Sequence, residues 1–280
     1  MAIFKKDGFD FFDGFFSEPV FNLDNSNFVE KLIYLKKHRI KNVSLDNTLI
    51  DFSFLEEINF LEEVYISNNI IVSDFYTLKN LKRIVVNIAK DKPNLDYSNF
   101  SKLEYLSIDW YLQFPDLSNN TNLKELVIWK FKPKAKSFSE LKLPKELENF
   151  EITESNVVNF EGLNLQKIKK LELSYCNALE SLESLNQVNF NLEVLVLESC
   201  KKLINYDNLG NFKNLRKIIL SNCGDIPNLK WLLKLKKVNH FSFWNTKLID
   251  GDTSPCSYID FVSFKNAKHY SHKEEEFIKH

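Results

Sequence analysis

The chain has 280 residues, of which 44% are hydrophobic and 27% are charged, with only 6 glycines and 7 prolines. This is the composition of a soluble globular protein. The 37 basic and 38 acidic residues nearly cancel, which argues against nucleic acid or an acidic membrane surface as the partner. No uncharged apolar stretch approaches the roughly 18 residues that a membrane span needs. We therefore expect no nucleic-acid binding and no membrane association.

The first segment, residues 1–39, opens with two lysines and then turns apolar, as a signal peptide does. Asp7, Asp10 and Asp13 interrupt its apolar run, however, and no small-residue cleavage site follows. We therefore expect a cytoplasmic protein.

The end of this segment predicts a short helix, because Phe28, Leu32 and Leu35 recur at helical spacing. Asn27 is expected to cap it, with Glu30 completing a capping box. We interpret residues 1–39 as an N-terminal cap on the array that follows. A phenylalanine-rich docking segment is the alternative interpretation.

From residue 40 to residue 267 the chain repeats one phrase, with apolar residues at its first, fourth and sixth places. The clearest copies contain LELSYCNAL from Leu171, LVLESCKKL from Leu195 and IILSNCGDI from Ile218. The phrase begins at Ile40, Leu61, Leu81, Leu103, Leu123, Leu147, Ile168, Leu192, Leu215, Val238 and Ile259. Starts 20 to 24 residues apart indicate a stacked repeat array in which each copy supplies one short strand.

The ninth place of the phrase ends each strand and turns the chain. It holds Thr48, Asn69, Ala89, Tyr111, Phe131, Ser155, Cys176, Cys200, Cys223, Thr246 and Ala267. Small or hydrogen-bonding side chains can satisfy the backbone of the neighbouring turn there. Cys256 recurs at a second apolar place. We therefore expect all four cysteines to be buried, reduced packing residues and not metal ligands, disulfide partners or nucleophiles.

This pattern resembles the leucine-rich repeat family over about residues 40 to 267. The stretch LEEVYISNNIIVSDFYTLKNL from Leu61 is similar to the short repeats of bacterial internalin-like proteins. The resemblance implies an α/β, mostly β solenoid: a curved array with a concave parallel sheet and short 3-10 or extended convex segments. Tyr111, Phe131, Pro144 and Asn189 depart from the pattern, so the middle repeats are expected to be less regular.

The last segment, residues 268–280, is predicted to be a polar C-terminal tail. His269 and His272 form an H-x-x-H pair there, but no third ligand lies nearby. A second local feature is the lysine-rich loop WKFKPKAK after the fifth strand, for which a solvated loop is the simpler interpretation and an anion or RNA contact the alternative.

The sequence contains no phosphate-binding glycine loop, nucleophile elbow or zinc-protease motif. We therefore expect no enzymatic activity, no cofactor and no metal.

Function is then expected on the exposed face of the strands, where alternate side chains point outward. Tyr105 and Trp129, with Val85 and Val127, predict an exposed apolar anchor patch, and three glutamates on the following copies favour a basic partner surface. The predicted partner-binding residues are Arg83, Val85, Tyr105, Asp109, Val127, Trp129, Glu151, Glu172, Glu198, His240 and Trp244.

These features predict a monomeric protein-protein interaction module that binds a folded protein partner on its concave face. A toxin-neutralising or regulatory role is one form of this hypothesis. The alternatives are an internalin-like surface or secreted adhesin, and a regulatory subunit that docks on an enzyme.

Overall fold

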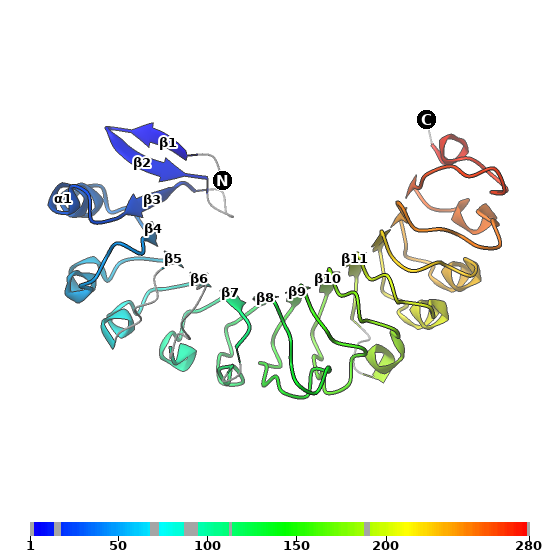
Figure 1. Cartoon of the computed structure of the whole chain (residues 1–280), viewed down its shortest axis with the longest axis horizontal. Helices are drawn as coiled ribbons and strands as arrows, with labels where there is room; N and C mark the ends of the chain where they lie inside the picture. The colour runs from blue at the N-terminus through cyan, green and yellow to red at the C-terminus, as the bar shows by residue number, and fades with distance from the viewer. Residues whose placement is uncertain are drawn as a thin grey trace. The chain divides into compact units, whose positions relative to one another are not determined.

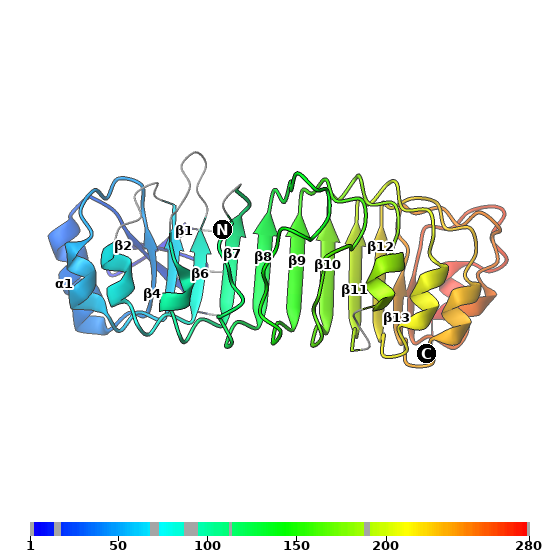
Figure 2. The same cartoon turned by 90° about the horizontal axis from the view of Figure 1, so that it is seen from below.

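The computed structural model describes residues 3–13, 18–67, 73–86, 95–111, 114–187 and 191–278. The chain divides into two compact units, residues 1–124 and residues 125–280. In each unit the strands lie side by side in chain order and the return segments lie on the opposite side of the repeats (Figure 1; Figure 2).

The first unit begins with an antiparallel hairpin, β1 (Ile3–Lys6) and β2 (Phe9–Phe12), which pairs with β3 (Val20–Leu23). Helix α1 (Phe28–His38) follows. A parallel ladder then continues from β3 through β4 (Asn42–Leu45), β5 (Glu63–Ile66), β6 (Arg83–Val86) and β7 (Tyr105–Asp109). The return segments contain the 3-10 helices η1 (Ser53–Ile58), η2 (Ser73–Thr77) and η3 (Tyr97–Asn99).

The second unit is a parallel ladder formed by β8 (Glu125–Trp129), β9 (Asn149–Thr153), β10 (Lys170–Ser174), β11 (Val194–Glu198), β12 (Lys217–Ser221), β13 (His240–Ser242) and β14 (Phe261–Ser263). Its 3-10 helices are η4 (Glu183–Gln187), η5 (Asp207–Asn211), η6 (Lys230–Lys234), η7 (Ser254–Cys256) and η8 (Glu274–Phe277).

Every predicted phrase contains a strand, β4 through β14, and each of these strands begins two residues after the phrase begins. The predicted repeat array, with its parallel sheet and short 3-10 returns, is thereby confirmed. The sequence analysis missed β3, which already pairs in parallel with β4. In β3, Phe21 and Leu23 occupy the fourth and sixth places, but Glu18 stands at the first, where an apolar residue is expected.

The core forms because the fourth and sixth places point inward from every strand. Leu195 and Leu197 on β11 are fully buried, as are Ile218 and Leu220 on β12. One repeat cannot cover these side chains alone, so stacking on its neighbours buries them. Burial of each side chain contributes roughly 1.5–3 kcal/mol.

The irregular repeat that follows β8 is filled by aromatic rings. Phe131 at the ninth place is fully buried, and its ring lies 5.4 Å from that of Phe138. Phe138 stacks in turn on Phe160 at 5.5 Å. Pro144 is buried as well, while Asn189 lies outside the described residues. A large ring therefore replaces the expected small residue because this longer loop encloses space for it.

A left-handed residue follows each of six successive strands in the second unit. These residues are Lys130, Glu154, Tyr175, Ser199, Asn222 and Asn245, with φ between 51° and 58°. The backbone N–H groups of the first five continue the ladder; that of Glu154, for example, donates to the Ser174 carbonyl at 2.9 Å. The turn needs this conformation although a non-glycine residue pays roughly 1–2 kcal/mol for it.

Short polar side chains begin most of the return segments. The Asp96 carboxylate accepts a hydrogen bond from the Ser98 backbone N–H at 3.0 Å, just before η3. Asn228 before η6 and Asp252 before η7 likewise accept a hydrogen bond from the backbone N–H of the residue two positions later. These Asx turns direct the chain into a 3-10 turn, where a longer helix has no room.

Two expectations about the ends of the chain are wrong. Asn27 precedes α1 in the left-handed conformation and makes no side-chain capping bond; Asp24 and Lys31, 2.6 Å apart, form a partly buried ion pair there instead.

The predicted polar tail is a packed C-terminal cap. The Tyr270 hydroxyl accepts a hydrogen bond from the Leu248 N–H at 3.0 Å. The buried Phe277 ring lies 6.0 Å from that of Phe264 on the last repeat. Gly251 permits this docking, because its φ is 71° and an added Cβ would lie 2.3 Å from the His269 carbonyl oxygen. The open end of the core requires such a cover.

The left-handed positions predict that Glu154→Gly stabilises the protein by about 1 kcal/mol, because glycine adopts this conformation without steric strain. Glu154→Val is the matched variant and should destabilise it, since a branched Cβ is least tolerated there. Urea denaturation measures both. Equal stability of the two variants would contradict the assignment of strain to this turn.

The C-terminal cap predicts that Phe277→Ala lowers the free energy of unfolding by about 2–4 kcal/mol through loss of core packing. Ile278→Ala is the control, because the Ile278 side chain is exposed. Thermal unfolding monitored by circular dichroism distinguishes them. A melting temperature of Phe277→Ala equal to that of Ile278→Ala would show that the last residues do not close the core.

Candidate functional site

The two units present different outward-facing strand surfaces. In the first unit this surface is largely buried. Tyr65, Val85 and Val20 form a buried cluster to which Phe12 and Tyr105 add partly buried rings. The Phe12 ring meets that of Tyr65 edge to face at 5.7 Å, so the N-terminal hairpin covers this part of the sheet.

The expectation that Val85 is exposed is therefore wrong: it is only 8% accessible. Arg83 is half-buried, and its Nε donates to the carboxylate of the fully buried Glu63 at 2.7 Å. Asp109 and Tyr105 are partly accessible at the two ends of β7. Arg83 and Val85 therefore make most of their contacts within the chain.

Tyr105 belongs to the first unit, whereas Val127 and Trp129 belong to the second. On β8, Trp129 is exposed but Val127 is buried, against expectation. Val127 lies beside Glu151 in the register of β8 and β9, inside the sheet face rather than at its rim. Strand pairing is continuous from β8 to β14, so the outward-facing sheet surface of residues 125–280 forms one face.

Parallel pairing aligns the outward-facing residues of this face into two rows. The first row is Glu125, Asn149, Lys170, Val194, Lys217, His240 and Phe261, and the second is Val127, Glu151, Glu172, Val196, Ile219, Ser242 and Ser263. We call these two rows, together with Trp129, Glu198 and Trp244, the concave face.

The acidic end of the concave face contains a pair of like charges. Glu151 and Glu172 are directly opposite each other on β9 and β10. Lys170 pairs with Glu172 at 2.8 Å. Burial and the neighbouring Glu172 carboxylate raise the pKa of Glu151 above its ordinary value, despite the opposing effect of Lys170. A like-charged cross-strand pair is unfavourable in the free protein.

The middle of the concave face is apolar, which the sequence analysis missed. Val196 on β11 and Ile219 on β12 are cross-strand neighbours, and Val194 lies beside them; all three are half-buried. The signal was present in the sequence, since outward places of these two phrases hold valine and isoleucine where the preceding phrase holds Lys170 and Glu172. Valine and isoleucine are common in strands whether or not they bind a partner, so their presence alone did not indicate a site.

The other end of the concave face is aromatic. The His240 ring stacks on that of Phe261 at 4.3 Å, and Phe261 remains 50% exposed. Burial and the nearby positive charge of Lys217 lower the pKa of His240. Trp244 is exposed just beyond β13. Glu198, half-buried at the end of β11, lies opposite Ser174 and Ser221. The predicted residues His240, Trp244 and Glu198 thus lie on one face with the apolar middle.

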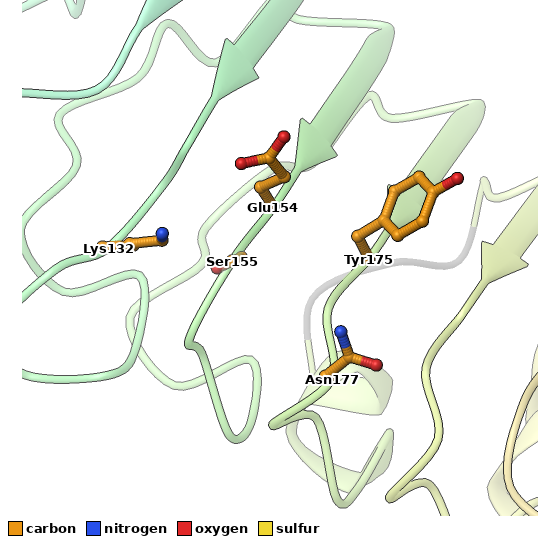
Figure 3. Close-up of a pocket in the computed structure, with 5 residues that line it drawn as sticks. All are labelled: Lys132, Glu154, Ser155, Tyr175 and Asn177. Atoms are coloured by element: carbon orange, nitrogen blue, oxygen red, sulfur yellow. The ribbon is translucent and has the colours of Figure 1, made fainter.

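An open hollow lies at the strand-exit edge of the same unit (Figure 3). Lys132, Glu154, Ser155, Tyr175 and Asn177 line it, from the loops after three successive strands. Its volume is about 410 Å³. One of its residues, Lys132, comes from the lysine-rich loop, but a lysine, a glutamate and neutral groups together select no single charge. Four of its five lining residues lie directly after β9 and β10, and none belongs to the concave face.

The repeated cysteines are free and buried. Ser155 and Thr246, at the ninth place of the adjoining repeats, are buried as well. The Cys223 thiol points at the Leu197 carbonyl at 3.3 Å, and the Thr246 hydroxyl donates to the equivalent Leu220 carbonyl at 3.1 Å. The Cys200 thiol meets the Leu173 carbonyl at 3.8 Å. Asn69 and Ala89, at the same place, lie outside the described residues. The thiols thus hold the turns of neighbouring repeats.

These surroundings make the thiols poor nucleophiles. A hydrogen bond with the Cys200 thiol, together with burial, raises the pKa of Cys223 well above its ordinary value. Burial raises the pKa of Cys256 to about 12. The thiolate is the reactive form.

We therefore predict that thiol-reactive reagents label the native protein slowly at all four cysteines and rapidly after denaturation. Cys200→Ser should fold with a loss of at most about 1–3 kcal/mol, because its hydroxyl can take the place of the thiol. Cys200→Leu should be less stable, since the turn has no room for a larger side chain. Fast native labelling of Cys176, Cys200 and Cys223 would contradict this role.

Across the described ranges, no group of three His, Cys, Asp or Glu side chains could hold a metal ion. In the H-x-x-H pair, His269 Nε2 lies 2.9 Å from the Leu248 carbonyl and His272 Nδ1 lies 2.9 Å from the Ser271 hydroxyl. Both rings are therefore engaged within the C-terminal cap. No helix in the described part of the chain is both long and apolar enough to span a bilayer.

Comparison with solved structures finds leucine-rich repeat proteins. An internalin, inlF from Listeria monocytogenes, is 17% identical and covers 80% of this chain and 85% of its own, with a TM-score of 0.33. The leucine-rich repeat domain of APL1B is 12% identical, covers 88% of this chain and 84% of its own, and has a TM-score of 0.46. The leucine-rich repeat domain of the type III effector XopL is 14% identical, covers 79% of this chain and 75% of its own, and has a TM-score of 0.40.

The fold is a leucine-rich repeat array of short repeats. This follows from the geometry of the repeats themselves: one short strand, a buried turn and a 3-10 or extended return in every 20 to 24 residues. No protein-family model matches the chain. No curated protein matches it at the level of sequence either.

Proposed function

We propose that the concave face of residues 125–280 binds a protein partner. The observation that carries the proposal is the half-exposed apolar middle, Val194, Val196 and Ile219, on a sheet held by continuous parallel pairing. An apolar centre with polar and aromatic surroundings has the composition of a binding hot spot. The neighbouring repeats hold the strands in place, so little order has to be gained on binding.

Charge selects the kind of partner. The concave face carries Glu125, Glu151, Glu172 and Glu198 against two lysines, Lys170 and Lys217. The partner surface is therefore basic around an apolar projection that meets Val196 and Ile219. A cation near Glu151 would also relieve its repulsion from Glu172, which the free protein retains.

The aromatic end supplies a second anchor. Trp244 and Phe261 are exposed beyond the apolar middle, and Trp129 is exposed at the opposite margin. Large rings on a rigid scaffold give contact area at low entropic cost. The function is then that of a binding module which covers a partner's surface, and a toxin-neutralising or regulatory protein would act through such masking.

This proposal predicts that a protein recovered with the chain from its own cells loses affinity when the apolar middle is truncated. Val196→Ala with Ile219→Ala should weaken binding by about 2 kcal/mol or more, mainly through faster dissociation. Trp129→Ala and Trp244→Ala test the two margins. Surface plasmon resonance measures the rates, and circular dichroism checks the fold.

Ile204→Ala is the matched control, because Ile204 is 71% exposed on a return segment and not on the sheet. Glu151→Lys, Glu172→Lys and Glu198→Lys should slow association and reduce its salt dependence. A photo-crosslinking residue at position 196 should label the partner, and one at position 204 should not. Unchanged affinity of the Val196→Ala, Ile219→Ala variant, with crosslinking only from position 204, would place the contact on the return segments instead.

A further inference from the structure

Helix α1, in the first unit, presents an apolar stripe to solvent. Lys31 and Leu35 are buried on its inner side. On its outer side, Val29 is 68% exposed and Ile33 is 61% exposed. The two are four residues apart and thus lie on one stripe of the helix. Packing among the described residues leaves both side chains largely exposed.

A hollow of about 310 Å³ lies beside the helix. Its apolar lining is Phe28 and Leu32 of α1 with Leu49, Ile50 and Phe54 from the next repeat, and its polar lining is Asn25, Asp51, Ser53 and Glu57. Ile50 is 77% exposed there. Single exposed apolar side chains are ordinary on protein surfaces, but a contiguous set of this kind marks an interaction surface.

The charges on the outer face of α1 are arranged with opposite signs at its two ends. Glu30 lies in the first turn, and Lys36 and Lys37 lie in the last. Glu30 and Lys37 are seven residues apart, so they share one flank of the helix about 10 Å from each other along its axis. Both are exposed. Reversing the helix direction therefore exchanges their positions, which makes the face complementary to itself.

We propose that α1 is a homodimer contact whose occupant is α1 of a second copy of this chain. A two-fold axis beside Ile33 packs this residue against its equivalent and places Val29 on the aliphatic stems of the lysines of the other copy. The same operation brings Glu30 of each copy to Lys37 of the other. Antiparallel pairing thus buries the apolar stripe and places opposite charges against each other in the same arrangement, as an isologous contact requires.

The size of the surface sets the strength of this dimer. A helix of 11 residues is about 16 Å long. Even with the hollow around Ile50, such a contact belongs to the small end of protein interfaces. The dimer is therefore reversible, with a dissociation constant in the micromolar range. The contact is separate from the concave face of residues 125–280 and does not rest on partner binding there.

Sedimentation equilibrium of the full chain, up to about 100 µM, tests the contact, since small interfaces associate in this range. The mass should rise with concentration from 33.0 kDa toward twice that value. Val29→Glu with Ile33→Glu should remain a monomer throughout. Ile249→Glu, which alters an exposed isoleucine of the second unit, should associate like the unaltered chain. Circular dichroism confirms folding of each variant.

A charge exchange gives the decisive readout. Glu30→Lys alone and Lys37→Glu alone should each weaken self-association about tenfold, because the two-fold axis repeats every change. An equimolar mixture of these two variants should associate at least as tightly as the unaltered chain, since every facing pair is then opposite in sign. A constant mass of 33.0 kDa for the unaltered chain would overturn the proposal. So would unchanged self-association of Val29→Glu, Ile33→Glu, or a mixture that associates no better than its components.

Discussion

Each repeat must reverse direction immediately after its strand, and this turn is the constraint on which the rest of the array depends. A spacing of 20 to 24 residues leaves no length for a regular helical return. In the second unit a left-handed residue makes the turn, and the ninth place closes it from inside with a hydroxyl, thiol or ring. The thiols of Cys200 and Cys223 reach carbonyls of the preceding repeat, so one side chain fixes two turns. Their burial is a consequence of this task, whereas Cys256 is buried at the second apolar place, in η7.

The same scaffold has different consequences for the two sheet faces. In the first unit the hairpin of β1 and β2 brings Phe12 onto Tyr65, and Glu63 and Arg83 form an ion pair beside them. That pair is costly to desolvate, and the packing that buries it also removes the face from solvent. In the second unit no described residue outside the sheet covers Val196 or Ile219 to the same extent, and both remain half-exposed. The difference makes residues 125–280 the better candidate for partner binding.

The strand positions could be predicted from sequence because burial acts on fixed places of a short repeat. Leu195 and Leu197 point inward wherever the phrase occurs, so β4 through β14 lie where the phrase predicts them. Contacts between distant segments were not predictable in this way. Val85 has an outward place in its phrase, yet the burial it shares with Val20 depends on a segment 65 residues earlier. Phe277 likewise lies in a stretch of charged residues, and only its packing on Phe264 identifies a cap. Asn27 had the right residue type for a cap but adopts a left-handed conformation that its side chain cannot use.

The candidate site shows where local rules stop being informative. Outward-facing valine and isoleucine suit a strand whether or not they bind anything, so Val196 and Ile219 gain meaning only from the register that makes them neighbours. The same register sets Glu151 against Glu172. A mobile surface could separate these carboxylates, but a central pair of strands bonded on both sides cannot slide without flipping every inward leucine to the surface. The core therefore fixes an unfavourable charge pair next to an apolar pair. Rigidity of this kind favours a partner whose basic and apolar groups have the matching spacing, and it disfavours one whose groups do not.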